Sequence, residues 1–224
     1  MGQRMKLHWS PRSPFVRKVM IVLHETGLTD EVELSRNVVA VQIPTPAEVL
    51  ADNPLGKIPA LVTEDGRQLV DSRVICEYLD LRAGTGLFPS ELRLRSAHLN
   101  WQALADGMTD VLLVWRTELT RENGPWQAVV DSWRVKVQAT MARFEAETDQ
   151  IAEAPFGIGH VALVAALGQL DFRWPDCGWR NHFLQLAALE AKLAGRPSVV
   201  ASKIRDDEGS DAGALTRRQL TFGV

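Results

Sequence analysis

The chain has 224 residues, of which 46% are hydrophobic and 24% are charged, and its formal net charge is −3 at pH 7. This composition is typical of a globular protein, and the weak negative charge gives no reason to expect a nucleic-acid partner. Two cysteines, Cys76 and Cys177, are too few for a disulfide framework or a four-cysteine metal site, and their spacing excludes a CxxC redox pair. We expect Cys76, which lies in an apolar run, to be a small buried residue.

No segment of the sequence indicates a membrane or an export signal. The N-terminus lacks the apolar region of a signal peptide. The most apolar stretch, residues 158–170, is interrupted by polar residues and falls short of the roughly 18 apolar residues that a membrane span needs. We therefore expect a cytoplasmic protein without a membrane partner.

Up to about residue 82, strand-like and helix-like patterns alternate along the chain. A glycine at position 27 ends the first helical pattern, and an Asp-Gly turn joins the last two strands. In chain order, we expect a strand over 5–9, a helix over 14–25, a strand over 31–34, an irregular stretch with two prolines, strands over 60–63 and 68–70, and a helix over 72–82.

Beyond a glycine- and proline-containing linker at residues 83–90, every pattern is helical. Helices are expected over roughly 92–120, 127–152, 160–173 and 180–194, with a short turn after Pro197. The sequence after residue 202 has no periodicity. It therefore predicts an α/β domain at 1–82, an all-helical domain at 91–201 and a flexible tail at 202–224.

A serine-rich corner separates the first strand from the first helix. Ser13 directly precedes Pro14, so we expect Ser13 to be the N-cap of the helix and Pro14 its first residue. An N-cap serine holds a hydroxyl group at the partly positive end of the helix. Ser10 is a second hydroxyl near the same strand end and is the alternative candidate for contact with a ligand.

Two further loops carry candidate binding residues. Pro59 stands immediately before an apolar strand. Because few X–Pro peptide bonds in folded proteins are cis, the sequence alone favours a trans bond and an ordinary strand start here. If the bond were cis, the backbone of Ile58 would be turned outward and could pair with an extended peptide. Asp71 and Ser72 lie at a strand-to-helix junction, where free N–H groups suit a carboxylate and an aspartate can accept from an ammonium group.

In this order, Ser13-Pro14-Phe15, Gly56-Lys57-Ile58-Pro59 and Asp71-Ser72 resemble the cytosolic glutathione transferase family, and more closely its bacterial, serine-type members. The resemblance covers about residues 5–200. It implies a thioredoxin-like α/β domain followed by an all-α domain, and a homodimer that acts on glutathione in detoxification without a metal ion.

The resemblance also implies a role for each matching residue. The Ser13 hydroxyl would contact the glutathione sulfur, with Ser10 as the alternative. The other residues implied in glutathione binding are Phe15 beside the serine, Ile58 and Pro59 at the cysteinyl part, Asp71 and Ser72 at the γ-glutamyl end, and Lys57 at the glycyl carboxylate.

The chemistry of a thiol agrees with such a role for a serine. A thiol with a pKa near 8.5 is mostly protonated at pH 7, and only its thiolate attacks electrophiles. Lowering that pKa by one or two units requires about 1.4–2.7 kcal/mol of preferential stabilisation. A hydroxyl donor and a helix N-terminus supply energies of that order, so Ser13 need not lose its own proton.

Several alternatives remain open at this point. A non-catalytic binding or regulatory protein with the same fold is one, and a glutathione-dependent dehalogenase, peroxidase or lyase is another. Leu104, Met108 and Leu112 share a helix face that is either the wall of a pocket for a small hydrophobic electrophile or, as we favour, core or dimer interface. Many relatives begin their sixth helix with a capping box; here Gly157-Ile-Gly-His160 stands there, so we expect that cap to be missing, with His160 only a weak replacement.

Overall fold

The computed structural model describes residues 4–207 and 220–222. Its contacts divide the chain into two units: residues up to 90 together with 197–207, and residues 91–196 together with the described part of the C-terminus. The helix α10 (Pro197–Ala201) packs on α1 (Pro14–Thr26) and so belongs to the first unit. From the sequence, residues 197–201 are instead expected in the helical domain and 202–207 in the tail. The rest of that tail, apart from 220–222, lies outside the described residues.

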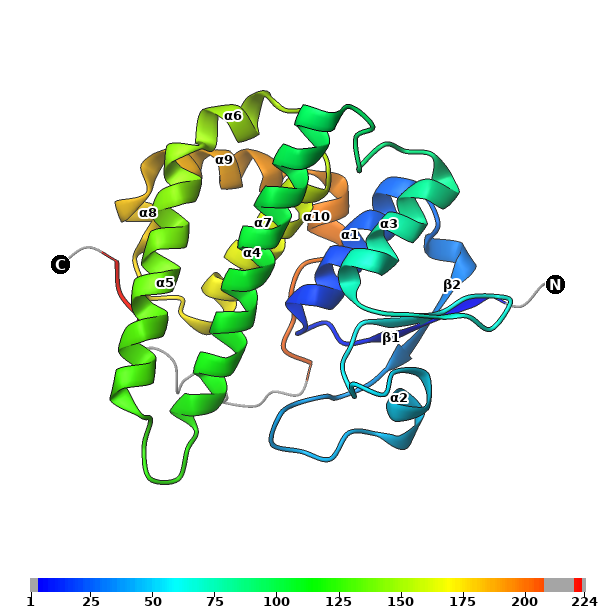
Figure 1. Ribbon diagram of the computed structural model, residues 1–224, viewed down its shortest axis with the longest axis horizontal. Coiled ribbons are helices and arrows are strands. Elements are labelled where there is room, and N and C mark those ends of the chain that lie inside the picture. The colour runs from blue at the N-terminus through cyan, green and yellow to red at the C-terminus, as the bar shows by residue number, and fades with distance from the viewer. Residues whose placement is uncertain (1–3, 208–219, 223–224) are drawn as a thin grey trace. The chain divides into compact units, whose positions relative to one another are not determined.

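A four-stranded sheet forms the centre of the first unit. Its strands β1 (Met5–Trp9), β2 (Val32–Arg36), β3 (Ala60–Val62) and β4 (Gln68–Leu69) lie in the order β2-β1-β3-β4. The strand β1 is parallel to β2 and antiparallel to β3, and β3 is antiparallel to β4. The helices α1 and α3 (Ser72–Ala83) cover one face of the sheet and α2 (Ala47–Asp52) lies on the other (Figure 1). This arrangement confirms the predicted thioredoxin-like domain.

The first helix begins where the sequence predicts and ends one residue later than predicted, at Thr26. Ser13 is its N-cap and Pro14 its first residue, and Gly27 ends it in the left-handed conformation with φ of 71°. The turn of 3-10 helix η1 (Thr29–Glu31) then leads into β2. The short helix α2 is a correction, because the sequence analysis treats this proline-containing stretch as irregular. With only six residues, α2 is too short to show a helical repeat.

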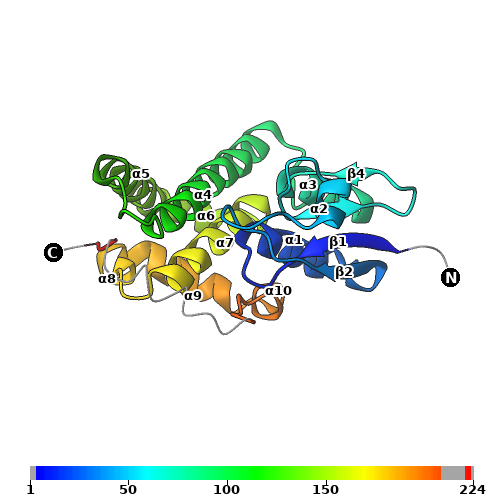
Figure 2. The ribbon, with the colours of Figure 1, turned by 90° about the horizontal axis from the view of Figure 1, so that it is seen from below.

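The second unit is helical throughout. The helix α7 (Ile158–Arg173) packs against α4 (Leu92–Leu119) on one side and α9 (Leu184–Ala194) on the other (Figure 2). The predicted helix over 127–152 is two helices, α5 (Gln127–Ala146) and α6 (Thr148–Glu153), and the one over 180–194 is α8 (Trp179–His182) followed by α9. None of the helices in the described part of the chain has the length and apolar character that a membrane crossing requires.

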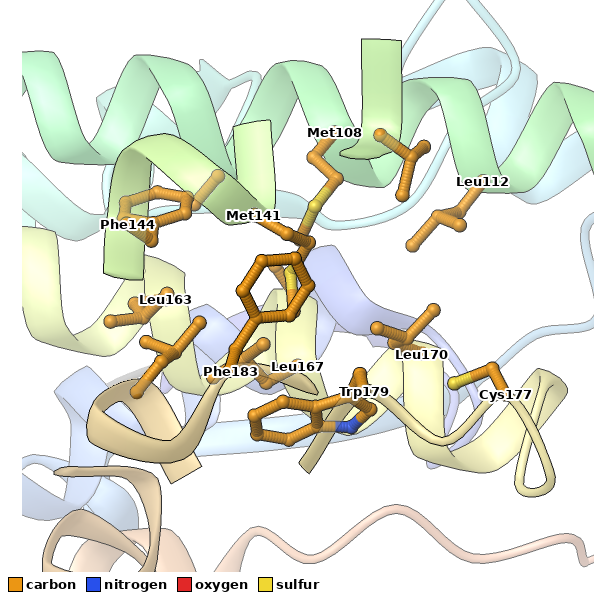
Figure 3. Close-up of a cluster of buried hydrophobic side chains, with 14 of the residues drawn as sticks. Met108, Leu112, Met141, Phe144, Leu163, Leu167, Leu170, Cys177, Trp179 and Phe183 are labelled. Carbon is orange, nitrogen blue, oxygen red and sulfur yellow. The ribbon is translucent and has the colours of Figure 1, made fainter. Parts of the chain in front are cut away.

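The core of the second unit decides the role of the predicted pocket face on α4. Met108 and Leu112 are buried among side chains of α5 and α7, including Met141 and Leu167 (Figure 3). Leu104 is partly buried against the same cluster. Met108 and Leu112 are therefore core residues, as favoured from the sequence, and Leu104 packs against that core.

The start of α7 is capped by His160, whose side chain takes the third position of a capping box. The backbone N–H of Gly157 donates to Nδ1 of His160 at 3.2 Å, and Nε2 of the same ring donates to the carbonyl oxygen of Ile151 at 2.7 Å. The imidazole thus makes the contact that the third-position side chain of a capping box makes with the N-cap backbone. The expectation that this cap is missing is wrong, because a ring held by a second hydrogen bond serves in place of a carboxylate.

Candidate functional site

The register of the sheet brings three separate loops to one end of it. His8 of β1 pairs with Ala60 at the start of β3, and Leu61 of β3 pairs with Leu69 at the end of β4. The end of β1, the start of β3 and the end of β4 therefore lie at the same end of the sheet. The segments that continue from those points, residues 10–13, 58–59 and 71–72, are the three candidate binding loops.

Ser13 presents its hydroxyl at the N-terminus of α1. Its Oγ accepts a hydrogen bond from the backbone N–H of Val16 at 3.3 Å, and its own N–H donates to the carbonyl of Ser10 at 3.2 Å. Because the oxygen serves as the acceptor for the helix, the hydroxyl proton remains available to donate. Ser10 is 6% exposed and its Oγ accepts from the N–H of Arg12 at 3.4 Å, whereas Ser13 is half-buried, so Ser13 is the more exposed of the two residues.

A small crevice of about 30 Å³ opens beside both serines. Its wall includes Arg17 from α1 together with Lys203 and Arg205 from the segment that follows α10. That segment is held to the serine-rich corner by the N–H of Arg205, which donates to the carbonyl of Pro11 at 3.3 Å. Basic side chains around a hydroxyl favour an anionic atom such as a thiolate, and the sequence analysis does not anticipate their contribution.

The loop before β3 is held by one asparagine. Asn53 donates from Nδ2 to the carbonyl of Lys57 at 2.8 Å and accepts at Oδ1 from the N–H of Leu55 at 3.0 Å. The bond between Ile58 and Pro59 is cis, which the resemblance implies and the base rate of such bonds does not. The Lys57 side chain is exposed at this loop.

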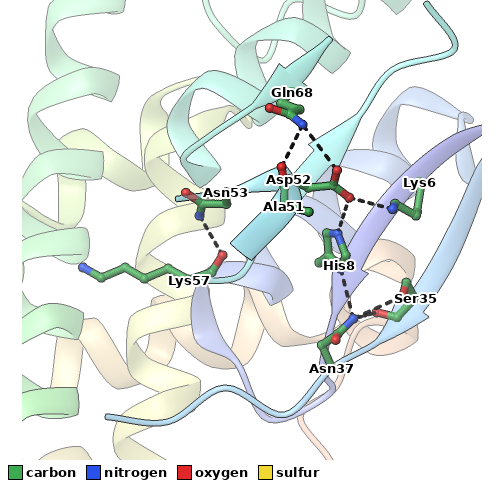
Figure 4. A network of polar contacts seen from close by, with 9 residues as sticks. All are labelled: Lys6, His8, Ser35, Asn37, Ala51, Asp52, Asn53, Lys57 and Gln68. Atoms are coloured by element: carbon green, nitrogen blue, oxygen red, sulfur yellow. Dashed lines mark hydrogen bonds and ion pairs between the residues drawn. The ribbon is translucent and has the colours of Figure 1, made fainter. Parts of the chain in front are cut away.

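A polar network fastens α2 to the sheet just before this loop (Figure 4). Oδ2 of Asp52 lies 2.6 Å from Nζ of Lys6 and 2.8 Å from Nε2 of the buried His8, while Nδ1 of His8 accepts from Asn37 at 3.0 Å. Burial raises the pKa of Asp52, but the hydrogen bonds from Lys6 and His8 outweigh it and hold that pKa below its usual value. The network fixes the end of α2, from which Asn53 and the binding loop follow.

Asp71 and Ser72 form the start of α3. Asp71 is the N-cap, and its Oδ1 accepts from the N–H of Arg73 at 2.9 Å. A second cis bond, between Val70 and Asp71, precedes it. The Asp71 side chain is exposed, whereas Ser72 is 2% exposed. The N–H groups in the first turn of a helix lack intrahelical acceptors, so this junction offers donors for a carboxylate beside an acceptor for an ammonium group.

Comparisons with known proteins identify the family. Residues 12–82 match the glutathione S-transferase N-terminal domain. The uncharacterized GST-like protein YibF of Escherichia coli K12 is 34% identical in an alignment of 202 positions, which covers 81% of this chain and 91% of that protein. The chain belongs to the glutathione S-transferase family.

Solved structures of glutathione S-transferases resemble this one closely. A family member from Pseudomonas fluorescens Pf-5 with bound glutathione is 39% identical and superposes with a TM-score of 0.85, over 90% of this chain and 100% of that one. A glutathione S-transferase from Methylobacillus flagellatus KT with bound glutathione is 32% identical, with a TM-score of 0.80 and coverage of 90% and 100%. The thioredoxin-like domain followed by a helical region is thus the fold of this family, as the sequence predicts.

Some features of this family member could not be recognised from single motifs. Lys18, for example, is buried in the middle of α1, although its position breaks the apolar pattern of that helix.

Within residues 4–207 and 220–222, no group of three or more His, Cys, Asp or Glu side chains is placed to hold a metal ion.

Proposed function

We propose that this protein is an enzyme that binds glutathione and adds it, through its sulfur, to small hydrophobic electrophiles. The observation that carries the proposal is the half-buried Ser13 at the N-terminus of α1, at the end of the sheet where the other two candidate binding loops also lie. Glutathione bound to relatives that are 39% and 32% identical supports the choice of co-substrate.

In this mechanism the residues of the first unit divide the tripeptide among them. The Ser13 hydroxyl donates to the sulfur, and the partial positive charge of the helix end favours the thiolate. The backbone of Ile58 before Pro59 pairs with the cysteinyl part, and Lys57 takes the glycyl carboxylate. At the other end, Asp71 and Ser72 hold the γ-glutamyl group. Phe15 contributes to glutathione binding beside Ser13.

The reaction needs no other cofactor. The thiol of glutathione releases its proton to solvent, and the thiolate uses an electron pair to form a bond to the electrophilic carbon of the second substrate. With an aryl halide, the carbon–halogen bond then breaks and the halide leaves with its electron pair. We propose that the enzyme acts in this way in detoxification, as a homodimer in the cytoplasm.

The test compares the parent protein with Ser13→Ala and Ser10→Ala. Each is bound to immobilised glutathione, and each is assayed for conjugation with an aryl halide across a range of pH. We expect Ser13→Ala to bind glutathione but to lose about 10- to 100-fold in kcat/KM at pH 7, which corresponds to one or two pKa units at the sulfur. Its pH–rate profile moves to higher pH, whereas Ser10→Ala remains close to the parent.

Three outcomes would contradict parts of the proposal. An unaffected Ser13→Ala variant removes this serine from the mechanism, and loss confined to Ser10→Ala moves the role to that residue. Binding of glutathione without conjugation of any electrophile, or with dehalogenase, peroxidase or lyase activity instead, refutes the proposed transferase reaction. A parent protein that does not bind glutathione refutes the proposed function as a whole.

A further inference from the structure

One charged side chain in the first unit lies where charges are rarely found. Lys18 stands in the middle of α1 and is 1% exposed. Lysine is almost never fully buried unless it has a partner, because removing its charge from water is costly. The contacts of its ammonium group therefore indicate what Lys18 does in the fold.

The Lys18 ammonium contacts two of the candidate glutathione-binding residues. Its Nζ donates to Oγ of Ser72 at 3.4 Å, which links α1 to the first residue of α3. The same atom lies 6.0 Å from the centre of the Phe15 ring, at the distance of a cation–π contact. Lys18 thus lies directly behind the junction at which Asp71 and Ser72 are proposed to hold the γ-glutamyl group.

The hydrogen bond to Ser72 has a defined direction. An ammonium group has three protons and no lone pair, so Oγ of Ser72 must be the acceptor. The serine hydroxyl proton is then directed away from Lys18 and is available to another acceptor. A donor that itself accepts from a cation is polarised and strengthened, and the burial of both groups limits the screening of the charge by water.

We propose that Lys18 is a positioning residue for the α-carboxylate of the γ-glutamyl group, which it favours by holding Ser72 as a donor and by placing a buried positive charge behind it. This inference rests on the proposed function, since it concerns how the same site recognises glutathione. It assigns the preference for a carboxylate at this end of the ligand to a residue that does not touch the ligand.

The experiment measures the affinity of three ligands by calorimetry for the parent, Lys18→Met and Lys18→Arg. The ligands are glutathione, γ-aminobutyryl-cysteinylglycine, which lacks only the α-carboxylate, and glutathione amidated at the glycyl carboxylate. Lys192→Met, which removes an exposed lysine in the other unit, is the matched control.

We expect Lys18→Met to bind glutathione about 10- to 100-fold more weakly than the parent, as loss of a buried charge near a carboxylate implies. Its affinity for the ligand without the α-carboxylate should fall by less than about 3-fold, because the interaction is already absent. The amidated ligand should lose as much as glutathione does. Lys18→Arg keeps the charge and should retain the parent's discrimination, and Lys192→Met should match the parent for all ligands.

The outcomes separate this inference from the proposed function. If the parent does not bind glutathione, the proposed function fails, and this inference with it. If the parent binds glutathione and Lys18→Met weakens all three ligands equally, Lys18 is purely structural and the inference is overturned.

A second variant covers the case in which Lys18→Met does not fold. Because Lys18 is proposed to act through Ser72, Ser72→Ala should reduce the parent's discrimination for the α-carboxylate by at least about 10-fold. An unchanged discrimination in folded Ser72→Ala overturns the inference without reference to any Lys18 variant.

Discussion

A buried histidine on α4 predicts how the stability of the protein depends on pH. His98 is 0% exposed. Its ring lies edge-on to the ring of Trp101, with 5.2 Å between their centroids, and the centroid of the His160 ring is 5.3 Å away. Nδ1 of His98 accepts from the backbone N–H of Gly159 at 3.2 Å. Burial, with a smaller contribution from His160, lowers the pKa of His98 to about 4.

The sign and size of the effect follow from the two protonation equilibria. In the unfolded chain a histidine has a pKa near 6.5, so between about pH 6.5 and 4 the unfolded state binds a proton that the folded state does not. The free energy of unfolding therefore falls as the pH falls through this range. With folded and unfolded pKa values of about 4 and 6.5, His98 alone costs about 2 kcal/mol between pH 7 and pH 5.

The assay is urea unfolding at pH 7 and pH 5 of the parent, His98→Asn and His24→Asn. Asparagine at position 98 can still accept a hydrogen bond but does not titrate, and His24 is an exposed histidine on α1. Carboxylates titrate alike in all three proteins, so the differences isolate each histidine. We expect the parent and His24→Asn to lose about 2 kcal/mol more than His98→Asn on acidification.

Two results would refute this reasoning. One is a His98→Asn variant whose stability falls between pH 7 and pH 5 as steeply as that of the parent. The other is an NMR titration of the folded parent in which the His98 ring takes up its proton near pH 6.5. Either would mean that the folded protein accommodates the charged imidazole at this buried position.

Four further substitutions test the packing and the loops. Gly159→Ala places a Cβ 2.9 Å from Cε3 of Trp101 and should lower the free energy of unfolding by about 1–3 kcal/mol in thermal denaturation. In the same experiment, Gly107→Ala, whose Cβ would have nothing within 4 Å, should raise the free energy of unfolding by about 0.5–1 kcal/mol. Asp80 accepts from the backbone N–H groups of residues 87 and 88 at 2.8 and 3.0 Å. Asp80→Ala should therefore lower the free energy of unfolding in urea by about 2–4 kcal/mol and speed proteolysis of the linker. An unchanged rate of cleavage would contradict this role. Asn53→Ala frees the binding loop from its 2.8 Å hydrogen bond and should raise KM for glutathione about 5-fold with little change in kcat, so a loss confined to kcat would argue against it.

The elements that could be predicted from the sequence are those with both a repeat and a terminal signal. The helix α1 has apolar residues at helical spacing between an N-cap serine and a final glycine, and it begins at the predicted residue, Pro14. The break between α5 and α6 has no such signal, because Glu147 and the residues on either side of it are compatible with a continuous helix. Local sequence alone therefore merges the two.

Buried polar residues were harder to predict than helices. A single apolar stripe describes a helix that covers a core on one side, but α1 packs against both α3 and α10. Lys18 therefore becomes buried outside the stripe. The network of His8 and Asp52 joins residues 44 positions apart, and only the packing of α2 on the sheet brings them within 2.8 Å. Sequence motifs predict which residue types occupy the binding loops, and the tertiary contacts determine what holds them.

The positive charge at the candidate site has an origin that the overall net charge of the chain does not reveal. The chain carries a net charge of −3, yet the helices α1 and α3 both begin at the end of the sheet where the binding loops lie. Their N-termini contribute partial positive charges, and the ammonium of Lys18 lies between the two helices. A buried charge and fixed backbone dipoles are screened by salt much less than surface side chains are. A site built in this way suits a ligand with two carboxylates and a thiolate, and its preference should persist at ionic strengths that abolish attraction to surface lysines.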